Sequence, residues 1–304
     1  MTTPPSHLAL SAEVADALSS GRPVVALEST LLSHGLPPGR NLDVAKRLEA
    51  GVREAGAVPA TIAVLDGRAV VGLSPTELER VCAPDSDLDK LSLRDIGPAI
   101  ALGRSGATTV AATTALAANA GVGVFATGGL GGVHLGASQS WDVSADLGVL
   151  ARIPTLVVCS GVKSVLDIPA TLEVLETGSV PVLGYRTGEF PAFYLRSSGH
   201  AVPWRVDDAA QAAAVVRAHR DVNCSGVLLA NPIPPAAEMD RELHDGLLAD
   251  GLKLLRDNDI TGAAVTPALL EHFHTASGGS SLDANEALVL ANARLAAEIA
   301  LELA

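Results

Sequence analysis

The sequence predicts an α/β protein with three layers (α/β/α), in which helices cover both faces of a mostly parallel central sheet. Short apolar runs rich in Val, Ile and Ala alternate with longer segments of helical period. In addition, 48% of the 304 residues are hydrophobic, which is enough for a large core. This alternation is typical of a parallel sheet, because each crossover between parallel strands needs a connection of about helix length.

Short apolar runs mark the expected strands, which are residues 23–27, 60–65 with 69–72, 108–112, 123–126, 155–159, 180–183 and 226–229. Segments of helical period mark the expected helices, which are residues 42–54, 75–81, 144–151, 165–176, 208–219, 238–257 and 282–303. Asp66-Gly67 lies between two apolar runs and predicts one tight antiparallel hairpin. No composition shift or internal repeat divides the chain, so we expect a single domain over residues 1–304, with residues 1–20 as an N-terminal helical extension.

The charge of the chain restricts its partners. Asp plus Glu number 34 against 21 Lys plus Arg, a formal net charge of −13, and no basic run provides a footprint for a nucleic-acid backbone. A small anionic substrate stays possible, because a few local donors outweigh a global field that salt screens within about 10 Å. We therefore expect no nucleic-acid partner but keep sugar phosphates as substrates.

The location of the protein is predicted from its cysteines and its amino terminus. Cys82, Cys159 and Cys224 are far apart and form no C-x-x-C pair, which favours reduced thiols over disulfides or a zinc site. The chain starts with no basic segment followed by an apolar one, and no uninterrupted apolar stretch reaches the ~18 residues of a membrane span. We expect a cytoplasmic protein that has no membrane partner.

Candidate site residues follow the expected strands, because ligands of parallel sheets bind at the carboxyl ends of the strands. These residues are Glu28, Thr113, the segment TGGLGGVHLG (127–136) and Lys163. The glycine-rich segment has neither the dinucleotide fingerprint nor the Gly-Lys-Ser/Thr of a nucleotide phosphate loop. One interpretation is that the backbone N–H groups of this segment bind an anion. The alternative is that the segment forms a tight turn at a crowded strand end.

Lys163, which follows TLVVCSG, suits nucleophilic chemistry. A lysine is a free amine only when burial or a second cation lowers its pKa from about 10.4 toward about 7 to 8. Such an amine attacks the aldehyde carbon of a sugar and forms a Schiff base. The alternative is a surface lysine at the start of the next helix.

Asp142 and Asp146 are four residues apart at the start of an expected helix, with Ser144 between them. Residues at this spacing share a helical face, so both carboxylates could address one cation. Oxygen ligands without a Cys or His pair favour Mg²⁺ or Mn²⁺ over zinc. The alternative is that Asp142 or Ser144 only caps the helix.

Nine segments extend this interpretation over nearly the whole chain. They are ALESTLLSHGLP (26–37), GAVPATIAVLDGR (56–68), GRSGATTVAAT (103–113), VFATGGLGGVH (124–134), WDVSADL (141–147), SGVKSVLDIPATLEVLET (160–177), EFPAFYLRSSG (189–199), ANPIP (230–234) and NARLAAEIA (292–300). In order and spacing they resemble the pseudouridine-5'-phosphate glycosidase family, which includes indigoidine-cluster homologues. The resemblance implies reversible cleavage of the carbon-carbon glycosidic bond of pseudouridine 5'-phosphate to uracil and ribose 5-phosphate, with Mn²⁺ or another divalent cation, in a homotrimer.

The resemblance also implies roles for single residues. Lys163 in SGVKS resembles the Schiff-base lysine of the family, and Glu28 in ALEST resembles its proton donor. Asp142 in WDVSAD resembles the aspartate that binds the metal. The positions that match substrate contacts are Lys90 for the sugar phosphate, Val110, Ser144, Ala145 and Asp146, with Thr127, His134 and Asn285 as further candidates for contacts with the base or the phosphate.

The chain departs from the family beside Lys90, where Ser92-Leu93-Arg94-Asp95 stands in place of a basic pair before the aspartate. Lys90 itself is present, so we expect an active enzyme. A Schiff-base lyase or aldolase acting on another sugar phosphate is the second hypothesis, and it would not release uracil. A catalytically silent sugar-phosphate-binding protein is the third, and its function would survive Lys163→Ala.

Overall fold

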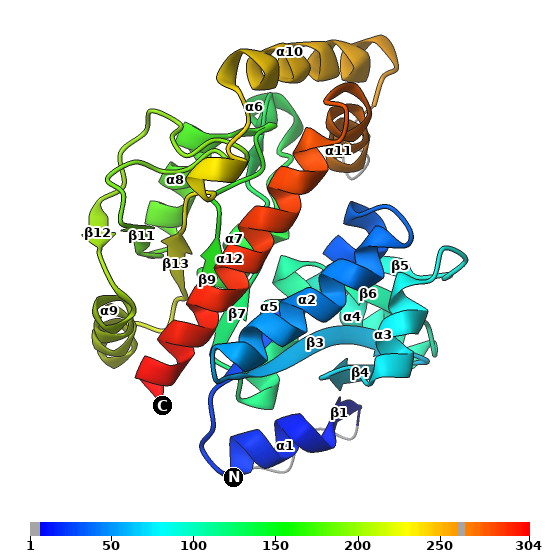
Figure 1. Cartoon of the computed structure of the whole chain (residues 1–304), viewed down its shortest axis with the longest axis vertical. Helices are drawn as coiled ribbons and strands as arrows, with labels where there is room; N and C mark the ends of the chain where they lie inside the picture. The colour runs from blue at the N-terminus through cyan, green and yellow to red at the C-terminus, as the bar shows by residue number, and fades with distance from the viewer. Residues whose placement is uncertain (1–6, 261–264) are drawn as a thin grey trace.

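The computed structural model of the chain describes residues 7–260 and 265–304. Its strands are β1 (Leu8–Leu10), β2 (Val24–Glu28), β3 (Val58–Leu65), β4 (Arg68–Val71), β5 (Asp89–Leu91), β6 (Gly106–Thr108), β7 (Val124–Ala126), β8 (Val133–His134), β9 (Leu156–Cys159), β10 (Leu166–Asp167), β11 (Val182–Tyr185), β12 (Trp204–Val206) and β13 (Val227–Ala230). Eleven of them form one sheet in the order β1-β4-β3-β2-β7-β9-β13-β11-β12, with β6 pairing β3 and β5 (Figure 1). Along that order β3 and β4 are antiparallel and the other neighbours are parallel, as the sequence predicts.

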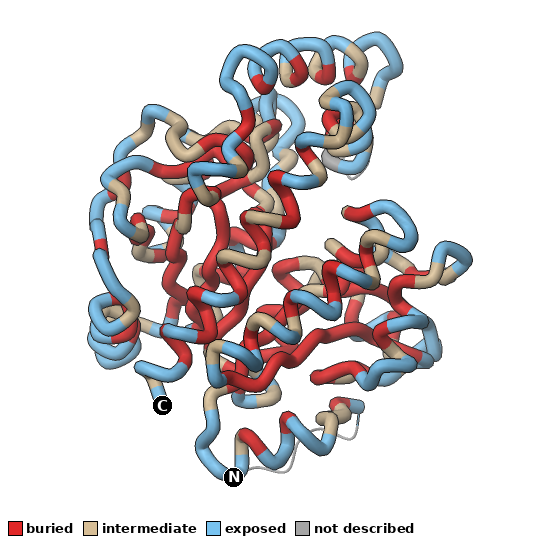
Figure 2. Tube along the Cα trace, viewed as in Figure 1, coloured by how far each residue is buried: buried red, intermediate tan, exposed pale blue. Residues whose placement is uncertain are grey.

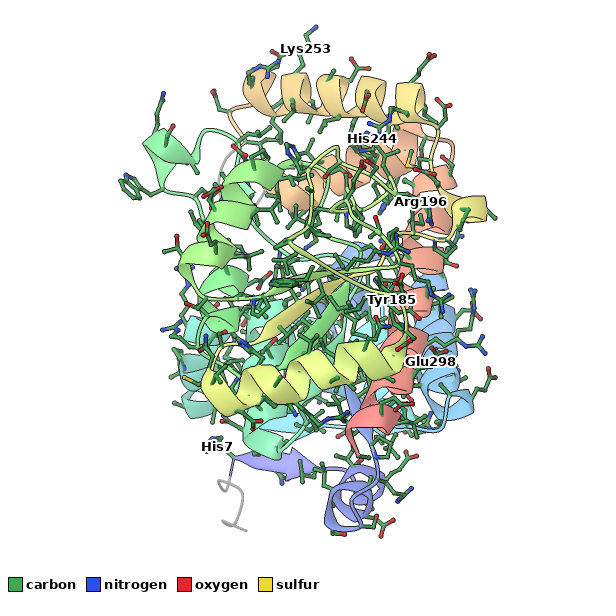
Figure 3. The ribbon with its side chains drawn as sticks, turned by 90° about the vertical axis from the view of Figure 1, so that its left-hand side faces the viewer. His7, Tyr185, Arg196, His244, Lys253 and Glu298 are labelled. Carbon is green, nitrogen blue, oxygen red and sulfur yellow. The ribbon has the colours of Figure 1, made fainter. Side chains whose placement is uncertain are left out.

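The helices are α1 (Ala12–Ser19), α2 (Arg40–Glu54), α3 (Pro75–Cys82), α4 (Leu93–Ala101), α5 (Val110–Ala120), α6 (Ala137–Ser140), α7 (Ala145–Leu150), α8 (Ile168–Thr177), α9 (Ala209–Val222), α10 (Arg241–Asp257), α11 (Val265–Ala276) and α12 (Ser280–Leu303), with a π-helix η1 (Leu31–Gly35) and a 3₁₀ turn η2 (Pro235–Ala237). α10 lies at one end of the molecule, beside α11 (Figure 1). Figure 3 shows Lys253 on its outer side and His244 on the side toward the body. No described helix has the length and apolarity needed to cross a membrane.

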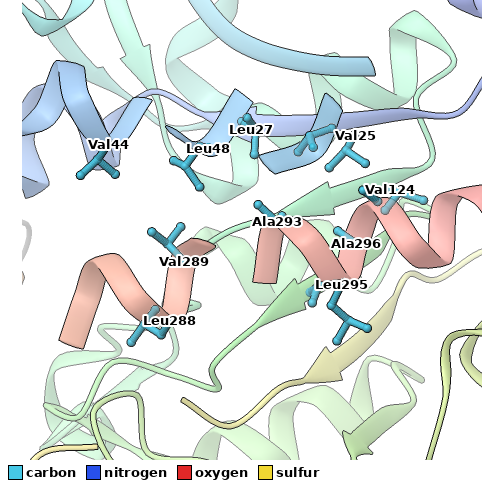
Figure 4. Close-up of a cluster of buried hydrophobic side chains, with 14 of the residues drawn as sticks. Val25, Leu27, Val44, Leu48, Val124, Leu288, Val289, Ala293, Leu295 and Ala296 are labelled. Carbon is cyan, nitrogen blue, oxygen red and sulfur yellow. The ribbon is translucent and has the colours of Figure 1, made fainter. Parts of the chain in front are cut away.

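Two apolar cores, one on each face of the sheet, make the three predicted layers. Val25 and Leu27 of β2 belong to the same core as residues of α2, α9 and α12, whereas Val24 and Ala26 belong to the core that contains residues of α1, α4, α5 and α7. This alternation follows from the strand period of two. Figure 2 shows that buried residues concentrate in the central strands and on the inner sides of the helices. Figure 4 shows Ala293 and other residues of α12 facing α2 and β2.

The predicted hairpin at Asp66-Gly67 is confirmed. Leu65 of β3 pairs with Arg68 of β4, which leaves two residues in the turn. Both have positive φ, +50° at Asp66 and +73° at Gly67, as a type I′ turn requires.

Two sequence predictions of structure are wrong in part. The expected strand at residues 108–112 ends at Thr108, and α5 starts at Val110. The first eight residues of α5 are all buried, so this helix shows no polar face and its sequence has no helical period. The expected N-terminal helical extension contains α1 but also the edge strand β1, which pairs with β4.

Candidate active site

A recess opens at the carboxyl ends of the central strands, where α11 and α12 approach the sheet. Four predicted site residues line it: Glu28, Lys90, Lys163 and Asn285. The other lining residues are Thr30, Leu31, His34, Gly35, Gly128, Gly129, Phe193, Pro267 and Leu270. Its empty volume is about 520 Å³, counting the part that is open to solvent. The recess thus joins two cationic side chains and a carboxyl group to an apolar wall.

The order of the strands brings Glu28 close to the loop of Lys163. Glu28 is the last residue of β2, and β7 lies between β2 and β9. Thr127 follows β7, and its hydroxyl donates a hydrogen bond to Oε1 of Glu28. The loop after β9 carries Lys163, which is half-buried and lies five residues before α8. Lys163 is therefore a recess residue and not a surface lysine that starts a helix.

Backbone hydrogen bonds connect the glycine-rich segment to the loop of Lys163. The amide of Leu130 donates to the carbonyl of Gly161 at 2.9 Å, and the amide of Lys163 donates to the carbonyl of Leu130 at 3.2 Å. A Cβ at Gly129 would lie 2.6 Å from the ring of Phe193, and one at Gly131 would lie 2.7 Å from the carboxyl of Asp146. These glycines allow close packing, which favours the tight turn over an open anion-binding loop.

Burial and charge act against each other at Glu28. Burial raises the pKa of its carboxyl above the ordinary value, while the charge of Lys163, the hydroxyl of Thr127 and the charge of Lys90 lower it. The balance is a raised pKa. A carboxyl in this state keeps its proton to a higher pH than an ordinary glutamate does, which suits it to act as a general acid.

Two basic groups in and beside the recess, Lys90 and His134, have pKa values below their ordinary values. Burial and the charge of Lys163 lower the pKa of Lys90, against the opposing charges of Glu28 and Asp146. Burial also lowers the pKa of His134, and there Asp142 opposes the shift while the two lysines add to it. These mutual influences place His134 within the same electrostatic group as Lys90 and Lys163.

Asp142 and Asp146 do not share a helical face, contrary to the interpretation from their spacing. Asp142 lies before α7, and Ser144 is the N-cap, which accepts a hydrogen bond from the amide of Asp146 at 3.2 Å. The two carboxyl oxygens of Asp146 accept from the amides of Ala111 and Gly131, each at 2.9 Å. The sequence could not show this, because both bonds come from segments distant in the chain. Asp146 therefore fixes the start of α5 against the glycine-rich segment.

The donor set around Asp142 fits a cation held largely by water and substrate oxygens. Oδ2 of Asp142 lies 3.8 Å from Nδ1 of His134, and the Asp142 side chain is 34% exposed. Within residues 7–260 and 265–304, no group of three or more His, Cys, Asp or Glu side chains forms a metal cage. Mn²⁺ and Mg²⁺ do bind through one or two carboxylates with water and phosphate completing the shell, so one carboxylate is sufficient for that mode.

Other predicted residues lie around the recess or outside it. Val110 is buried and starts α5, and Ala145 is exposed at the start of α7. Thr113 is buried inside α5 and donates to the hydroxyl of Thr108 at 2.8 Å, so its role is structural. Asn285 of α12 is 2% exposed, and its Oδ1 has no hydrogen-bond partner among the described residues.

The sequence interpretation missed several residues that line the recess. Thr30 and His34 follow Glu28 directly, so continuing the strand-end search by a few residues would have found them. Burial and the charge of Lys90 lower the pKa of His34. Phe193 and Leu270 are apolar and come from distant segments, and no sequence signal marks them as site residues.

Comparisons with known proteins agree with this architecture. The family described as indigoidine synthase A like protein matches residues 13–302. The pseudouridine-5'-phosphate glycosidase of Salinispora tropica is 56% identical over 97% of this chain and 91% of its own length. That of Streptomyces griseus is 54% identical over 97% and 92%.

A crystal structure shows the same fold. The prealnumycin C-glycosynthase AlnA, solved in complex with ribulose 5-phosphate, superposes with a TM-score of 0.91 at 41% identity, covering 99% of this chain and 98% of AlnA. The fold described above is thus that of a known group of enzymes. The chain belongs to the indigoidine synthase A-like family, together with proteins named pseudouridine-5'-phosphate glycosidase.

Proposed function

We propose that the protein reversibly cleaves the carbon-carbon glycosidic bond of pseudouridine 5'-phosphate, through a Schiff base between Lys163 and C1' of the ribose. The names of the full-length relatives support the reaction. AlnA, a C-glycosynthase solved with a pentulose phosphate, supports a pentose phosphate as the ligand of this fold. The observation that carries the proposal is the recess itself, in which Glu28 with a raised pKa lies beside Lys163.

The chemistry of the substrate explains why a lysine is needed. An ordinary glycosidase protonates a leaving oxygen, but here the leaving atom is carbon 5 of uracil. Nζ of Lys163 bonds to C1' while the bond from C1' to the ring oxygen breaks, and Glu28 gives that oxygen a proton. The secondary ammonium that results returns a proton to the Glu28 carboxylate. The freed lone pair of the nitrogen then forms the C=N bond as the C1'–C5 bond breaks, and C5 of uracil keeps the electrons of that bond and takes the proton from Glu28. Water hydrolyses the iminium and frees ribose 5-phosphate.

Charges and unpaired polar atoms around the recess support the binding of a phosphorylated nucleotide. Lys90 is the cation that we assign to the phosphate, with His134 beside it, and we assign Val110 at the start of α5 a contact with the substrate through its backbone. Asn285 and Thr30 each have a buried oxygen without a partner among the described residues, and both line the recess. We assign these two oxygens to the base, because unsatisfied buried polar atoms are costly unless a ligand pairs them.

The remaining contacts and the cofactor extend this proposal. Ser144, Ala145 and Asp146 contact the substrate from the start of α7, where the carboxyl of Asp146 also accepts from the amides of Gly131 and Ala111. Asp142 would hold a divalent cation, Mn²⁺ in the first instance, and such a cation would supply positive charge to the anionic substrate. A homotrimer in the cytoplasm is the proposed assembly and location.

The test is uracil release from pseudouridine 5'-phosphate by the purified protein, with added Mn²⁺ and with a chelator in parallel. Lys163→Ala is expected to abolish release, and Lys163→Arg as well, because a guanidinium keeps the charge but forms no Schiff base. Borohydride with ribose 5-phosphate is expected to attach the sugar to Lys163 of the wild type, as a mass shift on the peptide that contains residue 163.

The outcomes separate the three hypotheses. Trapping without uracil release would contradict the proposed substrate and favour a Schiff-base lyase or aldolase. Release that survives in Lys163→Arg would contradict the Schiff base. Binding of ribose 5-phosphate with neither trapping nor release would indicate a sugar-phosphate-binding protein.

A further inference from the structure

Asn292 is a polar residue in the buried stripe of α12, and it does not line the recess. Its side chain is 0% exposed, and Ala293, Ala296 and Leu288 around it belong to the apolar core. An apolar side chain would satisfy the packing at this position without the desolvation of an amide. The hydrogen bonds of Asn292 show what the amide does there.

Asn292 bonds to four residues, Thr127, Gly128, Ser160 and Asn231, which lie in three segments that each follow a strand of the sheet. Nδ2 donates to the carbonyl of Thr127 at 2.8 Å and to the hydroxyl of Ser160 at 3.1 Å. Oδ1 accepts from Nδ2 of Asn231 at 2.9 Å. Thr127 follows β7, Ser160 follows β9 and Asn231 follows β13, and these strands are neighbours in the sheet. The amide therefore joins three adjacent strand ends, and each of its polar atoms has a partner.

The bonded strand ends lead directly to the reacting residues. Thr127 is 0% exposed and turns its hydroxyl to Glu28, so the carbonyl and the hydroxyl of one residue connect Asn292 to that carboxyl. Ser160 lies three residues before Lys163, and its amide donates to the carbonyl of Gly128 at 2.9 Å. A fully paired buried network is rigid, and so it fixes the geometry of what it bonds.

We propose that Asn292 is a positioning residue, which holds Thr127 in the orientation from which its hydroxyl donates to Glu28. The inference rests on the proposed reaction and adds a residue that the reaction needs but that touches no substrate. When the side-chain amide of Asn292 is removed, the carbonyl of Thr127 loses its hydrogen-bond donor. Thr127 then changes its orientation, and its hydroxyl no longer donates to Glu28. The carboxylate form of Glu28 then loses a hydrogen bond that stabilises it, and its pKa rises further.

The experiment compares the pH dependence of kcat/KM for uracil release in the wild type and four variants. Asn292→Leu removes the amide while keeping similar volume and adding no charge. Thr127→Val removes the hydroxyl directly, the double variant combines both, and Asn231→Ala is the matched control because it removes only the bond to Oδ1 of Asn292. Circular dichroism and a thermal scan establish that each variant folds.

The expected result is a shift in one limb of the pH profile. Asn292→Leu and Thr127→Val each move the limb that Glu28 governs to higher pH, by a similar amount, and the double variant moves it no further. For Asn292→Leu, kcat falls by up to about 100-fold, as expected for a displaced catalytic group, with KM changed much less. Asn231→Ala keeps the wild-type profile.

Other results overturn the inference. An unshifted profile in folded Asn292→Leu, shifts that add in the double variant, or an equal shift in Asn231→Ala would each show that Asn292 does not act through Thr127. If Asn292→Leu does not fold, Asn292→Ala replaces it, and loss of the fold in both would make Asn292 a residue of the core and not of the site. Absence of uracil release from the wild type would contradict the proposed reaction instead, so the two failures are distinct.

Discussion

Glu28 couples the stability of the protein to its chemistry. Burial of its carboxyl raises its pKa, so at neutral pH the folded chain carries the cost of removing a carboxylate from water. The folded state binds this proton more tightly than the unfolded state does. The stabilising contribution of Glu28 is therefore fully present below the ordinary value of 4.5 and is lost as pH rises through the raised value.

Glu28→Gln is expected to separate stability from activity. Gln is neutral at every pH, so the variant should unfold at a higher temperature than the wild type at about pH 8 and at a similar temperature at about pH 4. Turnover should fall by about 100-fold or more, because Gln exchanges no proton. Thermal scans at both pH values measure the effect. A larger difference at the lower pH would contradict a raised pKa.

At the scale of residues, the sequence predicted the polar residues that line the recess better than the hydrogen bonds that hold them in place. Glu28 and Lys163 were found because they follow apolar strands, and the resemblance added Lys90 and Asn285, and all four line the recess. The bonds of Asp146 to distant amides and the contacts of Asn292 with three loops are long-range. They depend on the assembled sheet, and local spacing carries no signal of them.

At the scale of elements, the glycine-rich segment lets neighbouring side chains approach its backbone closely, because its glycines have no side chains. A Cβ at Gly131 would meet the carboxyl of Asp146, which holds the start of α5 as well. The segment, α5 and α7 therefore depend on one another at one point of contact. A substitution that adds one methyl group at this point tests the dependence.

Gly131→Ala is expected to destabilise the protein by about 1 to 3 kcal/mol, because its Cβ would collide with Oγ of Ser144 and lie 2.7 Å from Oδ2 of Asp146, so that overpacking disturbs both the N-cap of α7 and the carboxyl. Gly148→Ala is the matched control. It lies inside α7, and the nearest atom to its Cβ is Nη2 of Arg152 at 3.6 Å, so Ala should stabilise the helix by about 0.5 to 1 kcal/mol. Urea unfolding of both variants provides the comparison. Equal stability of Gly131→Ala and the wild type would contradict the prediction and show that the segment shifts to accommodate the added methyl group.

The boundaries of elements show where periodicity succeeds and fails. Helices with one polar face, such as α2 and α9, begin within two residues of the predicted position. α5 was missed because it is buried on every side, and an apolar run of this kind fits a buried strand equally well. The extra strands β8 and β10 have two residues each, which is too short for any period to appear.

At the scale of the whole molecule, α12 connects the two halves of the sheet. It packs against α2, α9, β2, β7 and β9, and Glu286 on it forms an ion pair of 3.1 Å with Arg47 of α2. Because α12 contributes to the core of both halves, its detachment exposes both cores, and we expect the two halves to unfold together.

We therefore expect one calorimetric transition, with equal calorimetric and van 't Hoff enthalpies. Ala296→Leu, at a position that is 0% exposed, should lower the midpoint without dividing the transition, since overpacking acts on both halves at once. Differential scanning calorimetry is the measurement. Two separate peaks in either protein would show that the halves unfold independently.

The parallel order of β2, β7 and β9 has a consequence for how this family diversifies. Neighbouring strands lie about 4.8 Å apart, so the spacing of the groups that break the bond is set by the backbone of the sheet and cannot drift gradually. The opposite wall, with Leu270 of α11 and Phe193, is built from elements outside that sheet. Mutation can reshape that wall while the bond-breaking groups stay in place. The accepted base can therefore change during evolution while the reaction stays the same. A library of variants intended to alter the accepted base should vary the wall that contains Leu270 and Phe193.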